Sequence, residues 1–359
     1  MTSIGTDLVA FAIALFATLG LTVPVRSLAL HYGLVDHPGP RKVHLEPIPL
    51  LGGIAIYLGF VLAILLTLHN VPRQQIASIV IGATLVAGVG FLDDRGLLHH
   101  QVKLFVGMPV AALILIASGI RAQLFSQFIP GTMGAVLDAC FTIFWVVGIT
   151  AAFSILDHMD GLCAGIAAVA AAFFTLAAIL NGQTMVRTLG AAVLGAALGF
   201  LRWNFNPAKI FMGDGGAMLL GFLMATLGLK VRPEGAAFPV GWLVPILILG
   251  VPIFDTSLVS ISRARRGLLP FTSPGKDHTA HRLSNLGLGH RGGVLVLYCQ
   301  GALFGILALL VPHLSPQAAY VLAGMLIAAG LVAVFLFESA PYERQEKMKK
   351  NLPRPEPAS

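Results

Sequence analysis

The segment NFNPAKIFMGDGGAMLLGF, which runs from Asn204 to Phe222, passes from a polar loop directly into an apolar run. One carboxylate, Asp214, stands at the boundary, between Gly213 and Gly215. A carboxylate at the mouth of a membrane helix costs free energy, and residues of this kind usually have a function. The pattern predicts a helix end at a membrane surface, with an acidic group placed to act there.

The composition extends the membrane assignment to the whole chain. Of the 359 residues, 57% are hydrophobic and only 11% are charged, whereas a soluble domain has about 25% charged residues. The mean hydropathy is +0.86. Spanning helices need about 17–25 apolar residues, and lipid offers other backbone conformations no hydrogen-bond partners. We therefore predict an all-α, polytopic integral membrane protein.

Eleven apolar runs are candidate spans, so we predict about 10–11 transmembrane helices in a single domain over residues 1–338. The runs cover approximately residues 8–25, 51–68, 76–91, 104–120, 134–153, 162–180, 186–201, 216–229, 238–260, 294–312 and 317–337. Residues 339–359 are charged and contain prolines, which predicts a disordered cytoplasmic tail.

Basic residues are distributed unevenly between the two sides that this order of spans defines. Eighteen of the 23 lie in the tail and in the loops after spans 1, 3, 5, 7 and 9. The positive-inside rule places this richer side in the cytoplasm. The formal charge of +7 fits topology and anionic lipid alone, or an anionic substrate approached from the cytoplasm, and it leaves both interpretations open.

The same side carries five polar segments that contain candidate functional residues. In chain order they are DHPGPRKVHLEPIPLLGG (36–53), GFLDDRGLLHHQVK (90–103), SILDHMDGLCAGI (154–166), the segment quoted first, and DTSLVSISRARRGLLPFTSPGKDHTAHRL (255–283). Asp157 and Asp160 would share a face if their segment were helical. Adjacent Asp93 and Asp94 would diverge unless a helix ends there.

Five carboxylates on one membrane face repel one another unless a cation shares them. Mg²⁺ prefers carboxylate oxygens, keeps several waters and binds phosphates well. Lys42, Lys103 and Arg282 have side chains that suit phosphate oxygens. Acids for a metal and bases for phosphate favour phosphoryl-type transfer, where positioning and charge neutralisation supply most of the rate. Ordinary interpretations remain, because helix-end carboxylates can be merely solvated and Asn204 can cap a turn.

Taken together, the motifs resemble those of the polyprenyl-phosphate N-acetylhexosamine-1-phosphate transferases. The motifs RKVHxxPIPxxGG, GFLDDR, DxxDGL, NPAKIFMGDxG and PFTSPxKxH occur in the order typical of that family, and the resemblance covers about residues 30–295. Any one motif alone would be weak. The resemblance implies a UDP-N-acetylhexosamine donor, an undecaprenyl or other polyprenyl phosphate acceptor, and Mg²⁺ or Mn²⁺. The lipid phosphate would attack the β-phosphate, and UMP would leave; we favour direct attack over a covalent aspartyl step.

The resemblance also implies roles for individual residues. The implied catalytic residues are Asp93, Asp94 and Lys103. The implied metal ligands are Asp214 and, weakly, Ser154. The implied nucleotide- and sugar-binding residues are Lys42, His44, Asp157, Asp160, Asn204, His278, His281 and Arg282.

Several positions depart from the family pattern. Ala151 and Ser154 stand at asparagine positions of the third loop, His158 replaces a glycine, and Ala280 interrupts a His-x-His-His run. Gly275 stands in place of an aspartate, and Gly215 and Ala217 stand in place of the threonine and serine of GDTGS. These departures leave the sugar and the metal affinity open, and an impaired family member is an alternative.

The predicted function is transfer of an N-acetylhexosamine 1-phosphate, GlcNAc-1-phosphate first, as the first membrane step of a cell-envelope glycan pathway. The alternatives are a phospho-MurNAc-pentapeptide transferase or a transferase for another UDP-N-acetyl sugar. A transporter or lipid flippase would instead place charges near the middle of the bilayer, and an intramembrane aspartyl protease would need two facing aspartates there. We expect a multi-pass cell (inner) membrane protein with its active site facing the cytoplasm and no nucleic acid partner. A homodimer is left open.

Overall fold

The computed structural model describes residues 3–38, 46–68, 71–98, 100–233, 238, 240–268 and 275–339. Two predicted binding residues, Lys42 and His44, lie outside the described residues. So does the predicted tail from residue 340 onward.

Helices make up nearly all of the described chain. The long helices are α1 (Ser3–His31), α2 (Gly52–Thr67), α3 (Arg73–Asp94), α5 (Met108–Ala117), α6 (Thr132–Leu156), α7 (Leu162–Leu180), α8 (Thr184–Asn204), α9 (Gly213–Lys230), α11 (Gly250–Arg265), α13 (Gly289–Leu310) and α14 (Pro316–Ser339). The shorter elements are α4 (His100–Val102), the π-helix η1 (Lys103–Gly107), η2 (Val240–Trp242), α10 (Leu243–Ile248), α12 (Thr279–Leu283), the π-helix η3 (Ser284–Leu288) and η4 (Val311–His313). Strands β1 (Val35–Asp36) and β2 (Ile48–Pro49) form one antiparallel pair.

Each of the eleven predicted runs falls on one of these helices or on consecutive ones. Among the described residues, seven helices are long and apolar enough to cross a membrane, or up to eight if the pair α10 and α11, bent by 77°, forms one span. Two further apolar helices, Gly52–Thr67 and Lys103–Ala117, are shorter. The prediction of an all-α polytopic membrane protein is confirmed.

Helix α9 lies in the middle of the bundle and is buried along nearly its whole length. It packs against α3 and α6 and also contacts α2 and α7. Glycines let these helices approach closely, because a Cβ at Gly90 would lie 2.5 Å from the Cα of Gly215, and one at Gly53 would lie 2.5 Å from the backbone nitrogen of Gly216. The first turn of α9 is therefore held tightly between α2 and α3.

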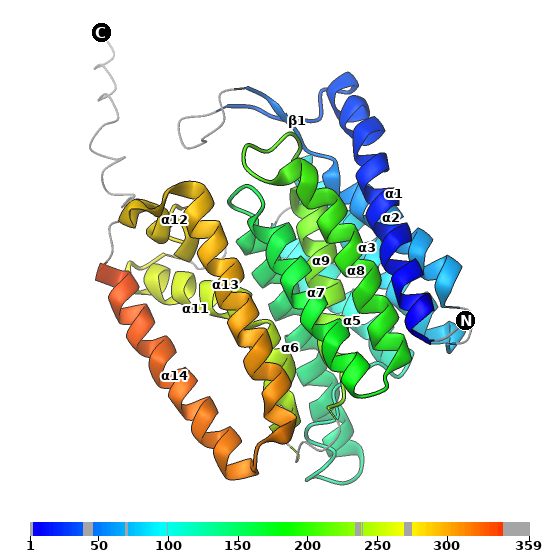
Figure 1. Cartoon of the computed structure of the whole chain (residues 1–359), viewed down its shortest axis with the longest axis vertical. Helices are drawn as coiled ribbons and strands as arrows, with labels where there is room; N and C mark the ends of the chain where they lie inside the picture. Colours follow the sequence, from blue (N-terminus) through cyan, green and yellow to red (C-terminus); the bar gives the residue numbers. More distant parts are fainter. Residues whose placement is uncertain are drawn as a thin grey trace.

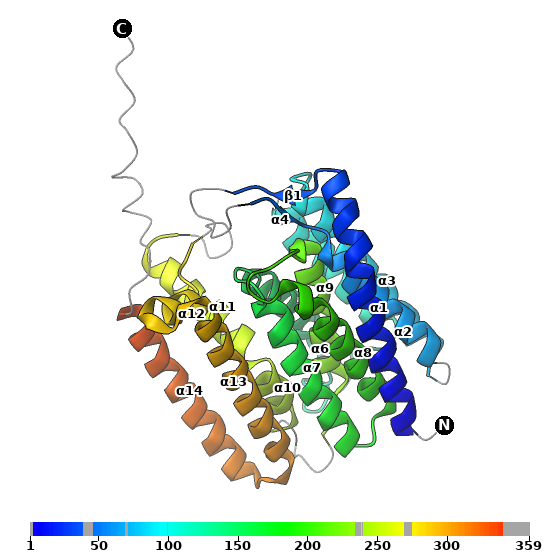
Figure 2. The ribbon, with the colours of Figure 1, turned by 45° about the horizontal axis from the view of Figure 1, so that its top comes forward.

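The polar segments gather at one end of the bundle. Figure 2 shows β1, α4 and α12 at this end, whereas the N-terminus lies at the opposite end. We call the end with β1, α4 and α12 the polar end. The outermost helix is α14, of which only Ala319 is buried, and it lies beside α13 at the edge of the molecule (Figure 1).

Candidate active site

The turn into α9 places Asp214 at the polar end. Gly213 precedes it with a φ of +71°, a backbone conformation that glycine adopts readily. A Cβ at Gly213 would also lie only 2.4 Å from Oδ2 of Asp94. Glycine is thus required twice here, for the backbone angle and for the close approach of Asp94.

Asp94, the last residue of α3, caps α9 from outside that helix. Its Oδ1 accepts a hydrogen bond from the backbone N–H of Asp214 at 2.8 Å, and its Oδ2 accepts one from Gly215 at 3.3 Å. The first N–H groups of a helix have no partner within the helix, and a carboxylate there also meets the positive end of the helix dipole. Asp94 therefore fixes α3 to the start of α9, and its predicted role near the lipid phosphate stays a prediction.

Lys103, the first residue of η1, connects two of the predicted aspartates. Its Nζ donates to Oδ2 of Asp214 at 2.8 Å and also to Oδ2 of Asp93. Ser154 donates its hydroxyl proton to the other oxygen of Asp214, at 2.8 Å. The side chains of Lys103, Asp93 and Asp214 are 17%, 14% and 28% exposed, so a ligand can reach them.

Asp157 follows directly on the end of α6 and faces the same region. Burial, and then the negative charges of Asp214, Asp94 and Asp160, raise the pKa of Asp157 to about 8. We call Asp93, Asp94, Asp157 and Asp214 the aspartate cluster. These carboxylates come from three separate loops. Each negative charge raises the free-energy cost of ionising the neighbouring carboxyl groups, which favours binding of a cation.

The segment that carries Asp157 and Asp160 is a turn and not a helix, so the two side chains do not share a helical face. The Oδ2 of Asp160 accepts hydrogen bonds from Nδ2 of Asn206 and from the backbone N–H of Ala208, both at 3.0 Å. Asp160 thus holds the loop between α8 and α9 in place.

Asn204 is 2% exposed and links the same two loops. Its Oδ1 accepts from the backbone N–H of Gly161 at 3.0 Å, and its Nδ2 donates to the carbonyl of Ile210 at 3.0 Å. The hydroxyl of Tyr298 donates to the carbonyl of Gly161 at 2.5 Å. Both ends of its amide are thus engaged in holding the third loop to the loop between α8 and α9. The predicted contact of Asn204 with the nucleotide stays a prediction.

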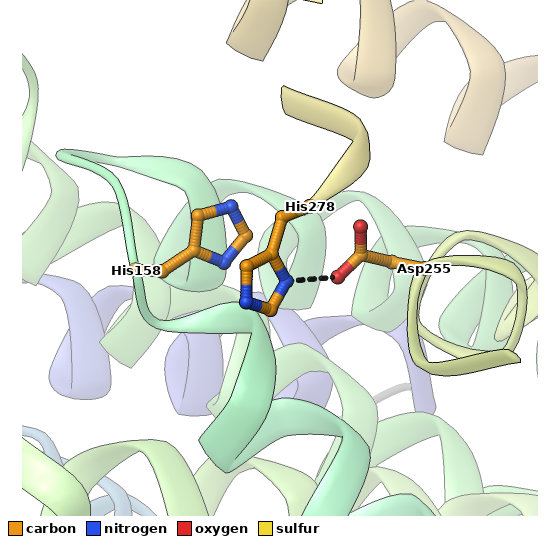
Figure 3. A group of neighbouring side chains, drawn as sticks. All are labelled: His158, Asp255 and His278. Carbon is orange, nitrogen blue, oxygen red and sulfur yellow. Dashed lines mark hydrogen bonds and ion pairs between the residues drawn. The ribbon is translucent and has the colours of Figure 1, made fainter. Parts of the chain in front are cut away.

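Histidines form a second group beside the aspartate cluster, shown in Figure 3. Nδ1 of His278 lies 2.9 Å from Oδ2 of Asp255, and the backbone N–H of Thr279 donates to the other oxygen of Asp255 at 2.7 Å. The ring of His158 stacks on that of His278 with centroids 3.8 Å apart, and its centroid lies 4.9 Å from that of His281. Since His158 follows Asp157 in the chain, this turn joins the two groups.

Sequence reasoning did not select His158 or Asp255 as site residues. Burial, and then the charge of His278, lower the pKa of His158 well below its usual range, so the ring is neutral at physiological pH. The available signals were the replacement of a glycine by His158 in the third loop, and the position of Asp255 at the start of the fifth loop.

Arg282 belongs to a third group, which holds the fifth loop to the helices. Its side chain is fully buried and donates to the carbonyl of Asp277 at 2.9 Å, to the hydroxyl of Ser262 at 3.0 Å and to a carboxylate oxygen of Glu338 at 2.9 Å. These contacts favour a structural role, and the predicted contact of Arg282 with the substrate stays a prediction.

Asp277 completes this third group through the guanidinium groups of Arg263 and Arg266. Burial alone would raise the pKa of Asp277, but hydrogen bonds from Arg263 and Arg266, together with the charge of Arg263, lower it to about 2. We call Arg263, Arg266, Asp277, Arg282 and Glu338 the arginine network. Every carboxylate in it has a guanidinium partner.

Two of these groups contain ligand atoms that suit a metal ion. Asp214, Asp93 and the Ser154 hydroxyl offer oxygen atoms, and Mg²⁺ is bound by one or two carboxylates together with water and phosphate oxygens. Within the part of the chain that the structure describes, the ligand atoms of His158, Asp255 and His278 lie within 4.8 Å of one another. These side chains are the group of three or more His, Cys, Asp or Glu residues that could hold a metal ion there. Its imidazoles suit Zn²⁺ and related ions better than Mg²⁺, and its His278–Asp255 hydrogen bond already pairs two of the three.

Comparison with known proteins identifies the family of the chain. Residues 76–232 match the model of glycosyl transferase family 4. A Bacillus subtilis protein named "Probable undecaprenyl-phosphate N-acetylglucosaminyl 1-phosphate transferase" is 37% identical over 308 residues, covering 84% of each chain. The "Decaprenyl-phosphate N-acetylglucosaminephosphotransferase" of Mycobacterium tuberculosis is 32% identical, covering 89% of this chain and 86% of its own length.

A more distant relative is the "Undecaprenyl-phosphate alpha-N-acetylglucosaminyl 1-phosphate transferase" of Escherichia coli, 27% identical over 93% of this chain and 90% of its own. The fold is an all-helical membrane fold with an acidic site at one end, and the relatives are all enzymes of one kind. The protein is therefore a membrane-embedded sugar-phosphate transferase. More closely, the chain belongs to the polyprenyl-phosphate N-acetylhexosamine-1-phosphate transferases of glycosyl transferase family 4.

Proposed function

We propose that the protein transfers N-acetylglucosamine 1-phosphate from UDP-GlcNAc to undecaprenyl phosphate, with the active site at the cytoplasmic face of the cell membrane. The products are undecaprenyl-diphosphate-GlcNAc and UMP. The observation that carries the proposal is the contact of one ammonium group, on Lys103, with the carboxylates of Asp93 and Asp214 at a membrane helix end. The names of the three relatives support the sugar and the lipid.

The reaction joins two anions, so charge neutralisation is its main requirement. An oxygen of the lipid phosphate forms a bond to the β-phosphorus of the nucleotide sugar. The bond from that phosphorus to the oxygen that bridges the two phosphates breaks, and UMP leaves with this oxygen. Lys103 is the described cation closest to both aspartates and can neutralise phosphate charge as it develops.

Asp93 and Asp94 make different contacts, which supports different roles for these two adjacent residues. Asp94 is occupied by the first N–H groups of α9. Asp93 contacts a side chain, Lys103, and not the backbone. Asp93 is therefore the better candidate to accept a proton from the lipid phosphate, while Asp94 is a positioning residue.

We propose that Asp214 and Ser154 hold Mg²⁺ or Mn²⁺ when substrates bind. Bound there, the ion would neutralise charge on the diphosphate of the donor. The carboxylate and hydroxyl oxygens at this position fit a hard divalent cation, and the excess of carboxylates over cations in the cluster supports the assignment.

A transferase for a different UDP-N-acetyl sugar is the second candidate. The observation that favours it is the stacking of His158 on His278 at 3.8 Å. This stacking places an imidazole in the third loop, where the family pattern has a glycine, so the shape of the neighbouring pocket differs from the usual one.

The test is release of UMP by the purified protein in detergent, with undecaprenyl phosphate, Mg²⁺ and a panel of UDP-sugars. We expect release with UDP-GlcNAc. Release with another sugar alone would replace the sugar assignment, and no release with any of them would refute the proposed activity. A matched control is Asp36→Asn, which changes an aspartate of β1 at the same polar end but outside the aspartate cluster.

A further inference from the structure

A cavity of about 540 Å³ lies at the polar end, where α8 passes into the loop that leads to α9. Figure 1 shows α8 between α1 and α7, and it packs against both. The lining residues that matter for the argument are Leu198, Leu201, Arg202, Trp203 and Lys209. We call this cavity the α8 corner. None of its lining residues belongs to the aspartate cluster or to the arginine network.

Three basic side chains meet at the α8 corner. The guanidinium carbon of Arg202 lies 5.9 Å from the ring centroid of Trp203, and the ammonium nitrogen of Lys209 lies 5.8 Å from it. Arg26 reaches the corner from α1, because its Nε donates to the carbonyl of Lys209 at 3.1 Å. Within the described part of the chain, no carboxylate forms an ion pair with any of these three cations. The corner therefore carries positive charge that no described acidic side chain neutralises.

The α8 corner lies where a membrane span ends. Helix α8 is apolar and long enough to cross a membrane, and Arg202 stands in its last turn. One turn earlier on α8, the apolar side chain of Leu198 is exposed. The indole N–H of Trp203 donates to the carbonyl of Leu19 at 3.1 Å, which fixes the ring against α1. Tryptophan is enriched at the level of the lipid head groups, and arginine or lysine near a helix end extends its charge toward them.

We propose that the α8 corner binds the head group of an anionic phospholipid, with the lipid phosphate beside Arg202 and Lys209. Basic pockets of membrane helices bind anionic head groups, since each lysine or arginine near the membrane surface attracts their charge. An acyl chain of the same lipid covers the exposed side chain of Leu198, whereas a free anion leaves that apolar surface uncovered. The occupant is a lipid of the bilayer and not a substrate, so this inference goes beyond the proposed function and does not depend on it.

Two doubly substituted proteins test the site at equal loss of charge. The corner variant combines Arg202→Gln with Lys209→Gln, and both of these side chains belong to exposed residues. The hydrogen bond from Arg26 is kept, because it goes to the backbone of Lys209. The matched control combines Arg73→Gln with Arg121→Gln. Arg73 begins α3, whose other end carries Asp93 and Asp94, so it lies at the opposite end of the bundle, and both control residues are exposed.

The experiment is native mass spectrometry of the full-length proteins in detergent, with phosphatidylglycerol or phosphatidylcholine added at the same concentration. The wild type and the control should bind phosphatidylglycerol in preference to phosphatidylcholine. In the corner variant the affinity for phosphatidylglycerol should fall about tenfold or more, because two basic side chains beside the head group are lost. Equal binding of the two lipids by the wild type would overturn the proposal. So would an unchanged affinity in the corner variant or an equal fall in both variants.

Two further measurements test the source of the phosphate and the role of charge. Inorganic phosphate at the same concentration should leave phosphatidylglycerol bound, and displacement would identify a site for free anions instead of a lipid. A protein with Arg202→Lys and Lys209→Arg keeps both charges and should bind phosphatidylglycerol like the wild type. A loss as large as that of the corner variant would show that the substitutions act through the fold of α8, which would overturn the assignment. None of these results depends on the release of UMP, so the lipid site and the proposed reaction can fail separately.

Discussion

The aspartate cluster and the arginine network lie at the same end of the protein but balance their charges in opposite ways. Among the residues that the structure describes, one ammonium group, that of Lys103, pairs with two of the four carboxylates of the cluster, those of Asp93 and Asp214. In the arginine network, Asp277 and Glu338 are met by the guanidinium groups of Arg263, Arg266 and Arg282, and Arg265 also lies 3.6 Å from Glu338. Unpaired buried charge is costly, whereas a fully paired network holds its parts in one arrangement. The difference supports the proposal that the cluster binds a cation, whereas the paired network holds the fifth loop.

The largest expected effect is on the rate. Asp214→Asn should lower kcat by about 10²–10³-fold, because it removes a group that organises charge at the reacting phosphates. The melting temperature in detergent should stay near that of the wild type, since one carboxylate leaves a cluster with excess negative charge. Full activity in this variant would remove Asp214 from the site.

Arg282→Met should show the opposite pattern. It leaves the carboxylate of Glu338 with only the exposed guanidinium group of Arg265, at 3.6 Å, and the hydroxyl of Ser262 with only a 3.4 Å contact from Arg266. The free energy of unfolding should therefore fall by about 3 kcal/mol. Chemical denaturation measures this loss, and the activity per folded molecule should change little. A large rise in the KM for the UDP-sugar with unchanged stability would instead show that Arg282 binds substrate.

The pH dependence of stability tests the crowding of carboxylates. Because the pKa of Asp157 is raised to about 8 from a reference of 3.8, the folded state binds the extra proton between these values. Its stabilising effect is complete below the unfolded pKa and is lost as the pH rises toward the folded pKa. The melting temperature without divalent ions should therefore fall as the pH rises from about 4 to about 8, and Asp157→Asn should flatten this slope. A slope equal to that of the wild type would show that Asp157 is not the group responsible.

The smallest expected effect concerns the turn that joins the two groups of the site. Tyr298→Phe removes the hydrogen bond to the carbonyl of Gly161 and should lower the free energy of unfolding by about 1 kcal/mol. The rate should fall only slightly, because Asp160 and Asn204 still hold the neighbouring loops. A loss of activity as large as that of Asp214→Asn would mean that the position of this turn controls the chemistry.

Sequence periodicity and length were sufficient for the helices, because each apolar run must satisfy its backbone within itself in lipid. The motifs were sufficient to bring Asp93, Lys103 and Asp214 into one region. The contacts of Asp94 were not predictable in this way, since its hydrogen-bond donors lie 120 and 121 residues away on α9. Whether Asp94 caps α9 depends on how α3 packs against α9, and the local sequence around Asp94 does not specify that packing.

Other misses have local causes. The turn after α6 begins at Asp157, whose φ of −80° and ψ of 56° are not helical, and it ends at Gly161, whose φ of +77° precedes α7. The stacking of His158 on His278 joins positions 120 residues apart and follows from tertiary packing alone. The guanidinium group of Arg282 is of a kind that binds phosphate, but the side chain is buried and its partners are protein groups. A loop motif does not show whether a side chain is buried.

The ammonium group of Lys103 has a consequence for the order in which ligands arrive. Resting between Asp93 and Asp214, it acts as a tethered counter-ion, so a divalent ion alone gains little by taking its place. An incoming diphosphate attracts the ammonium group away from the carboxylates and leaves them free to coordinate. Ion and nucleotide sugar are therefore expected to bind synergistically, each tightening the other by the same factor.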